Sequence, residues 1–357
     1  MAQALKFGKG VWATKTGSSM AYSDTNDRYK PLPFNVERDS IATRVNKEGL
    51  IEVVGRDKLR IDYTDTDKGV ALLEPSATNL ILNSQKISLI PIQNGTFVDN
   101  FAISPDGTQN ATKLTAIDTD PYFYQSVPFS AGSYTASIYV KGIGNSIGKD
   151  FQIRLGGASS EQIEIPSEWT RIEYTATMTS GSVNCGIEIT NPAVIGDEVL
   201  VWGWQIEQGS YPTSYIPTSG SAVQRAADVA NNAGNSEVFN DSEGVLFANI
   251  AALANDQTER QITIDDGNGV NRIVLRYNSV SNNINAYLFN GSVQGGEFNQ
   301  SLSDISLFSK CAFKYKTNNF QFWINGFKVG VDTNGSTFSD GTLSDLNFDF
   351  GGGFNFY

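Results

Sequence analysis

Residues 198–220 read EVLVWGWQIEQGSYPTSYIPTSG, and this stretch decides the fold. Its first half alternates with a period of two, which is typical of a β-strand and predicts Trp202 and Trp204 on one face of a sheet. Pro212 and Pro217 then end the pattern, because proline lacks the backbone donor that a sheet needs. We expect a last core strand whose tail is pinned to the domain by aromatic residues. The alternative is that the same aromatic face is exposed and stacks on a sugar ring.

Short alternating segments of the same kind recur along most of the chain. They lie at 134–141, 151–155, 169–177, 185–190, 244–250, 261–265, 272–277, 285–291 and 311–316. We expect a turn at 265–269 between two of them, and pairing of 311–316 with 320–329. Many short strands at this spacing, with 34 glycines for tight turns and no long helical periodicity, predict an all-β fold. The expected parts are an extended N-terminal region (1–75), a first antiparallel β-sandwich of jelly-roll type (76–220), a linker (221–236) and a second sandwich (237–357).

The chain is acidic, and this excludes some classes of partner. Its 38 acidic and 26 basic side chains give a net charge of −12, and such a chain is a poor partner for a phosphate backbone. No apolar run approaches the roughly 20 residues of a membrane-spanning helix, and the N-terminus lacks the pattern of a secretory leader. We therefore expect no nucleic acid partner, no membrane insertion, and a soluble protein made in a cytoplasm.

The residue inventory argues against an enzyme. The sequence has no histidine, which excludes Ser-His-Asp and Cys-His nucleophiles and every zinc site that uses histidine. Cys185 and Cys311 are expected in different domains, buried as small apolar residues, and two distant cysteines cannot make a structural zinc site. No motif places a pair of carboxylates for glycoside hydrolysis. We expect no catalytic residue and no cofactor.

The stretch 118–124, DTDPYFY, places two carboxylates beside three consecutive aromatic residues. Neighbours on a strand face opposite sides, so at least one of these rings is expected to be exposed. An exposed ring can stack on a sugar, and carboxylate oxygens suit calcium, so a structural calcium ion is left open. The candidate glycan-binding residues are Tyr122, Phe123, Tyr124 and Trp204. The alternative is a plain turn that runs into a core strand.

Several stretches resemble known modules. WGWQIEQG (202–209) and PTSYIPT (212–218) are similar to the closing segment of a jelly-roll module that recurs in tail-fibre and head-fibre proteins of tailed bacteriophages. This module in turn resembles carbohydrate-binding modules. LLEPSATNLILNS (72–84) is similar to its opening strand, and SPDGT (104–108) to its early hairpin. In the second sandwich, WINGFKV (323–329) resembles the central hairpin of laminin-G and concanavalin-type sandwiches.

The resemblance implies a structural virion fibre protein of a bacteriophage, made in the cytoplasm of the bacterial host. Such a protein is anchored to the particle by its N-terminal region and presents its sandwiches to the host surface. The implied partners are other virion proteins of the capsid or tail, further copies of the chain in a homotrimer, and a host cell-surface glycan. Head and tail both stay open as the location. The alternative function is that of non-catalytic binding modules of a polysaccharide-degrading enzyme.

The N-terminal region has too few apolar residues for a core of its own, whereas both sandwiches have enough alternating strands to fill theirs. Burial yields about 25 cal/mol per Å² of apolar area, but ordering the backbone costs about 1–2 kcal/mol per residue. We therefore expect residues 1–75 to hold the trimer and to dock on the virion; the alternative is that this region is a disordered tail. The apolar residues assigned to that contact are Phe7, Trp12, Tyr22, Tyr29, Phe34, Ile41, Val45, Leu50 and Ile51.

Overall fold

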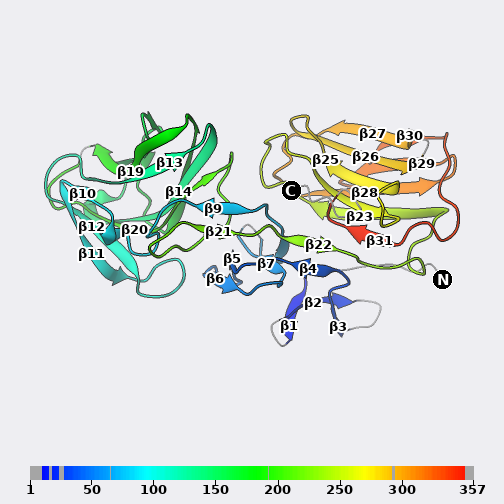
Figure 1. The fold of residues 1–357 in the computed structure, drawn as a ribbon, viewed down its shortest axis with the longest axis horizontal. Coiled ribbons are helices and arrows are strands. Elements are labelled where there is room, and N and C mark those ends of the chain that lie inside the picture. The colour runs from blue at the N-terminus through cyan, green and yellow to red at the C-terminus, as the bar shows by residue number, and fades with distance from the viewer. Residues whose placement is uncertain are drawn as a thin grey trace.

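The structure is a computed structural model, and it describes residues 10–15, 18–23, 28–64, 66–191, 193–291 and 294–349. Within these ranges the chain is all β, as predicted, and its helical segments are the single 3-10 turns η1 (Ile87–Leu89) and η2 (Gly144–Ser146). Neither of these described helices is long or apolar enough to cross a membrane. Figure 1 shows two β-sandwiches side by side, with short N-terminal strands below and between them.

The first sandwich consists of two antiparallel sheets. One, which we call the tyrosine sheet, has the strand order β10-β13-β19-β15-β16, and β17 also pairs with β15. Its strands are β10 (Ile92–Gln93), β13 (Tyr122–Phe129), β15 (Asp150–Leu155), β16 (Ala158–Ser159), β17 (Ile163–Glu164) and β19 (Gly181–Asn191). The other, which we call the tryptophan sheet, has the order β11-β12-β20-β14-β18. Its strands are β11 (Gly95–Ala102), β12 (Ala111–Ala116), β14 (Gly132–Ile143), β18 (Thr170–Met178) and β20 (Glu198–Gln208).

The core of the first sandwich comes from its own strands and adjoining loops. Its buried members lie between Ile81 and Ile206, and they come from both sheets. The alternating segments predicted at 134–141, 151–155 and 169–177 lie in β14, β15 and β18 and supply much of this core. Their apolar residues face inward because a period of two places every second side chain on the same face.

Strand β20 does not keep its two tryptophans on one face, so that prediction is wrong. The register with β14 slips by one residue between Trp202 and Gln205, so two residues of β20 lie opposite one residue of β14. This β-bulge falls at Gly203, whose φ of +67° lies in the left-handed region that favours glycine. The slip reverses the alternation, and Trp204 enters the core of the first sandwich while Trp202 belongs to a separate cluster.

Trp202 lies on the outer face of the tryptophan sheet, where later and earlier parts of the chain cover it. Its ring centroid is 4.5 Å from that of Tyr215 and 5.6 Å from that of Tyr139. Ile51, from the N-terminal region, completes this cluster. The tail of the strand is therefore pinned by an aromatic residue, as predicted, and the alternative of an exposed tryptophan face is wrong.

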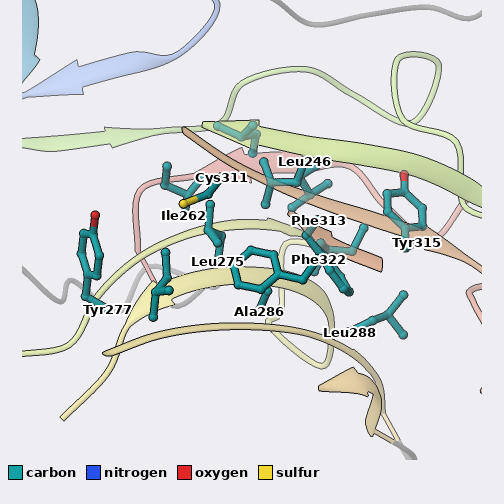
Figure 2. Packing of buried hydrophobic residues seen from close by; sticks show 14 of the residues in the cluster. Leu246, Ile262, Leu275, Tyr277, Ala286, Leu288, Cys311, Phe313, Tyr315 and Phe322 are labelled. Carbon is teal, nitrogen blue, oxygen red and sulfur yellow. The ribbon is translucent and has the colours of Figure 1, made fainter. Parts of the chain in front are cut away.

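The second sandwich also has two antiparallel sheets. The four-stranded sheet has the order β23-β28-β29-β30, and the five-stranded sheet has the order β27-β26-β25-β24-β31. The strands are β23 (Glu243–Ile250), β24 (Arg260–Asp265), β25 (Asn271–Tyr277), β26 (Asn283–Asn290), β27 (Gln294–Ser301), β28 (Ser309–Lys316), β29 (Phe320–Ile324), β30 (Phe327–Asp332) and β31 (Asp345–Asn347). Figure 2 shows side chains of both sheets meeting in its core, among them Leu275, Phe313 and Phe322.

The core of the second sandwich extends into the N-terminal region. Phe34, Leu59 and Ile61 are buried in the same cluster as the sandwich residues. The ring of Phe34 contacts the ring of Phe348 edge-on, with centroids 5.6 Å apart. The prediction that both sandwiches fill their own cores is therefore wrong for the second one. At this edge Phe34 packs in the same cluster as Leu346 of the last described strand, β31.

The N-terminal region forms short strands that depend on the rest of the chain. A three-stranded sheet contains β1 (Trp12–Lys15), β2 (Ser18–Ser23) and β3 (Arg28–Pro31), and two hairpins contain β5 (Ala42–Val45) with β6 (Ile51–Val54) and β7 (Arg60–Asp62) with β8 (Val70–Leu72). Strand β4 (Asn35–Glu37) pairs with β22 (Val229–Asn231), and β9 (Ala77–Asn79) pairs with β21 (Val223–Arg225). The segment 221–236, predicted as a linker, thus contributes two paired strands.

A buried ion network joins this segment to the N-terminal region. Asp228 Oδ1 accepts a hydrogen bond from Arg38 Nη1 at 2.7 Å, and its Oδ2 pairs with Arg60. Glu74 Oε2 lies 2.6 Å from Arg60 Nη1 and 3.5 Å from Arg225 Nη2. Burial alone would raise the pKa of Glu74, but the charges of Arg60 and Arg225 outweigh it and lower that pKa to about 2. This segment is therefore held in place by paired strands and by the buried Arg225 and Asp228, and it is not a free tether.

The apolar residues predicted to form a trimer contact differ in how deeply they are buried within one chain. Phe34 and Ile51 are buried by this chain's own sandwiches. Tyr29, Ile41 and Leu50 stay exposed. Trp12, Tyr22 and Val45 are half-buried, and Phe7 lies outside the described residues. Part of the apolar surface that was predicted to contact other copies is therefore buried within the chain, and part stays exposed.

Candidate functional site

The three consecutive aromatic residues of β13 divide between the two faces of the tyrosine sheet. Phe123 points inward and is fully buried, and its ring meets the ring of Trp204 edge-on at a centroid distance of 5.3 Å. Trp204 is 0% exposed. Neither side chain can contact a glycan in this structure, so their assignment as binding residues is wrong. Period-two alternation explains the result, because it turns Phe123 away from both neighbouring tyrosines.

Tyr122 and Tyr124 lie together on the outer face. Their ring centroids are 5.8 Å apart and their planes differ by 28°, so the two rings form one stacked pair. The Tyr122 hydroxyl donates a hydrogen bond to Oε1 of Gln93, which lies opposite it on β10. Both rings are half-buried, so each keeps part of its surface open to solvent. This pair is the part of the predicted site that the structure brings together.

An ion pair lies beside the tyrosines on the neighbouring strands. Glu188 of β19 is the register partner of Tyr122, and Gly186 is the partner of both Tyr124 and Arg154. The Nε of Arg154 pairs with Glu188. The Arg154 side chain is 51% exposed and the Glu188 side chain 13% exposed, so the guanidinium forms the accessible side of the pair. The sheet order β13-β19-β15 thus places polar groups directly next to the aromatic pair.

Gly186 lies where two neighbouring strands of the tyrosine sheet approach each other closely. A Cβ atom at this position would lie 2.3 Å from the backbone oxygen of Phe123 and 3.0 Å from Cβ of Tyr124. A larger residue would therefore push the strands or the Tyr124 ring out of place. The absence of a side chain therefore lets the backbone of β13 approach β19 closely at Phe123 and Tyr124.

The sequence did not predict Glu188, Arg154 and Gly186 as neighbours of the two tyrosines. Each lies in a segment whose alternation was recognised, but the segments are separated along the chain by tens of residues. Local patterns predict strands and not their order in a sheet, so these neighbours of Tyr122 and Tyr124 could not be assigned. A Gly in the strand pattern of 185–190 was the available signal, because a strand glycine often marks close approach of another backbone.

The arrangement fits binding better than catalysis or metal ligation. Glu188 is held in an ion pair, and no second carboxylate belongs to this set of residues. Asp118 accepts a hydrogen bond from the backbone of Thr119 in the exposed turn before β13. Across the ranges that the structure describes, no group of three or more Asp, Glu, Cys or His side chains is arranged to hold a metal ion. The calcium ion left open by the sequence stays a prediction.

Comparison with known proteins adds a weak likeness to solved structures. No protein-family model matches the chain, and no curated protein matches it. Among solved structures, a carbohydrate-binding module (CBM6cm-2) from Cellvibrio mixtus lichenase 5A in complex with cellotriose is similar to part of it. The alignment covers 39% of this chain and 100% of that one, with 18% sequence identity and a TM-score of 0.26. At this level the likeness carries no argument about the ligand or the role of this chain.

Proposed function

We propose that the protein is a non-catalytic structural protein that binds glycans on the outer face of the tyrosine sheet. The observation that carries the proposal is the stacked pair Tyr122–Tyr124 beside the ion pair Arg154–Glu188 on an open sheet face. Tyrosine rings pack against the C–H groups of a sugar ring, while guanidinium and carboxylate groups exchange hydrogen bonds with its hydroxyls. Because the two charges compensate each other, the face suits a neutral sugar.

We further propose that this binding serves a bacteriophage fibre protein located in the virion. The support is the similarity of residues 72–84, 202–209 and 212–218 to the jelly-roll module of phage fibres. Its partners would be other virion proteins, two further copies of the chain and a glycan of the host cell surface. Tyr29 and Ile41, which stay exposed on the N-terminal region, offer apolar surface for the contact between copies.

The test is glycan-array binding by the full-length chain and by the double variant Tyr122→Ala/Tyr124→Ala. Each aromatic contact is worth about 0.5–1.5 kcal/mol, so the double variant is expected to bind its best glycan roughly 5- to 150-fold more weakly. Phe101→Ala is the matched control, because Phe101 is 44% exposed on the other sheet of the same sandwich. It should leave binding unchanged.

Light scattering of the same samples gives the oligomeric state, and a trimer is expected, since several weak sites acting together raise the avidity. A blank array from assembled protein, or equal affinities of the double variant and the parent, would refute the glycan site. A monomer that binds would refute the fibre assembly and leave the site standing. Shortening of a bound glycan would contradict the non-catalytic role.

A further inference from the structure

The outer face of the four-stranded sheet in the second sandwich carries a row of apolar and aromatic residues. The strand register places Phe247, Ala312, Trp323 and Lys328 side by side across β23, β28, β29 and β30. Phe247 is 60% exposed. Lys328 Nζ lies 5.8 Å from the centroid of the Trp323 ring. The row therefore contains two aromatic side chains, separated by Ala312, and ends at a lysine.

Lysines lie on both sides of this row. Lys310 and Lys314 precede and follow Ala312 by two residues on β28, so all three side chains share one face, with each lysine about 7 Å along the strand from the row. Beside Lys314 in the register are Val245 and Gln321, an exposed apolar side chain and a half-buried amide. The face thus has one row with aromatic side chains, and a lysine lies on each side of that row.

The lysines are concentrated here although the sandwich as a whole is acidic. Residues 237–349 contain 13 acidic and 7 basic side chains, and all four of their lysines lie on β28 or β30. These four are Lys310, Lys314, Lys316 and Lys328. A cluster of like charge on one face of an oppositely charged domain makes that face attractive to anions.

Only one of these lysines is neutralised by a neighbour on the same face. Lys316 pairs with Glu243 at 2.7 Å. In the part of the chain that the structure describes, no ion pair involves Lys310, Lys314 or Lys328. Three cations around the aromatic row therefore form no direct ion pair, although the charge of Lys314 also helps to lower the pKa of Glu243.

One end of this face opens into a groove of about 3190 Å³. The groove is lined by Phe247, Lys310 and Lys314 from the second sandwich and by Tyr139 and Arg171 from the first. Phe247, Lys310 and Lys314 therefore lie at the edge of this groove, whereas Trp323 and Lys328 lie on the sheet face outside its lining.

We propose that this face binds an acidic polysaccharide, a polymer of sugar rings that carry carboxylate, sulfate or phosphate groups. The aromatic row offers ring faces a surface on which to pack, and the flanking lysines supply point charges for the anionic groups at the edges of the polymer. A polysaccharide fits better than a lipid bilayer, because Trp323 lies half-buried in the sheet and does not project from it. The site is separate from the tyrosine sheet and does not rest on the function proposed there.

The test is titration of the full-length chain with polygalacturonate, heparin and phosphomannan, beside carboxyl-reduced polygalacturonate as the neutral polymer. At least one polyanion is expected to bind, and its affinity should fall as salt rises because salt screens exposed charges. The neutral polymer should not bind at this face. Lys310→Gln/Lys314→Gln should weaken binding roughly 2- to 30-fold, and Trp323→Ala roughly 2- to 12-fold.

The matched control is Lys47→Gln/Lys86→Gln, which removes the same charge from two exposed lysines elsewhere on the chain. This control and the double tyrosine variant should both bind the polyanion like the parent. The proposal is overturned if no polyanion binds, if the neutral polymer binds as well as the charged one, or if both lysine pairs weaken binding equally. It is also overturned if vesicles of phosphatidylglycerol, and none of the three polymers, show the loss in the Lys310→Gln/Lys314→Gln variant.

Discussion

The two sandwiches complete their cores in different ways. The first core comes from residues between Ile81 and Ile206, which belong to that sandwich and its adjoining loops. The second core also buries Phe34, Leu59 and Ile61, which come from the opposite end of the chain. A boundary drawn along the sequence therefore does not separate the parts that are stabilised together. Phe34, Leu59 and Ile61 are thus stabilised by the second sandwich, although the first one lies between them in the chain, whereas Ile51 packs on the first sandwich.

The largest expected effect comes from breaking the buried ion network that holds these parts together. Glu74→Gln removes one of two carboxylates that face three arginines, and loss of one partner from a buried ion pair costs roughly 3–5 kcal/mol. Urea unfolding measures the change. The matched control is Glu168→Gln, because Glu168 forms an exposed ion pair with Lys141 and such pairs contribute at most about 1 kcal/mol. Equal losses in both variants would contradict the network's role.

The same variant predicts how the stability depends on pH. The folded-state pKa of Glu74 is about 2, below its ordinary value of 4.5. Ionised Glu74 therefore stabilises the folded chain fully above about pH 4.5, and this contribution is lost as the pH falls toward 2. The stability gap between the parent and Glu74→Gln should be constant near neutral pH and shrink across that window. A gap that is as wide at pH 3 as at pH 7 would show that the charge is not its cause.

A somewhat smaller effect sharpens the comparison between the two cores. Phe34→Ala should destabilise the second sandwich by about 3 kcal/mol, because it opens a cavity at the edge of that core. Phe129→Ala is its counterpart in the first core, since both side chains are 6% exposed. Hydrogen exchange of the amides separates the two outcomes. Phe34→Ala should speed exchange in β26, Phe129→Ala should speed it in β13, and the reverse pattern would contradict the assignment of Phe34 to the second core.

The smallest expected effect concerns the bulge that divides the two tryptophans. Gly203→Ala forces a residue with a Cβ into the left-handed region, which costs about 1–2 kcal/mol. The nearest side-chain atoms would lie 3.4 Å from that Cβ, an ordinary contact, so the backbone conformation is the cause of the cost. Gly157→Ala is the control, because nothing lies within 4 Å of its added Cβ. If the midpoint temperature of unfolding shifts equally for both variants, the left-handed conformation at residue 203 is not the cause of the destabilisation.

Local patterns in the sequence predict the strands well and their disruptions poorly. The predicted pairing of 311–316 with the following strand is confirmed, with Cys311 opposite Ile324. The turn predicted at 265–269 does connect β24 to β25. The bulge at Gly203 was missed because one inserted residue leaves a local pattern almost unchanged but reverses every later side chain. The isolated glycine between two tryptophans was the signal for it.

The candidate site shows the same limit. Alternation correctly required Tyr122, Phe123 and Tyr124 to face both sides of a sheet, and the inward residue is the one flanked by the other two. The neighbouring residues Arg154 and Glu188 could not be predicted. They lie beside the tyrosines because β13, β19 and β15 are adjacent in the sheet, although these strands are distant in sequence. The burial of Phe34 was missed for a related reason, since its partner Phe348 lies near the other end of the chain.

The contact between Phe34 and Phe348 also sets the order in which the chain can fold during its synthesis. At about 5–20 residues per second, Phe34 is made roughly 15–60 s before Phe348. In that interval the first sandwich can form, because its core needs nothing that follows residue 206. Phe34, Leu59 and Ile61 cannot pack in their final cluster until the second sandwich has been translated. A chaperone that holds exposed apolar segments therefore has a defined period in which to act on the nascent chain.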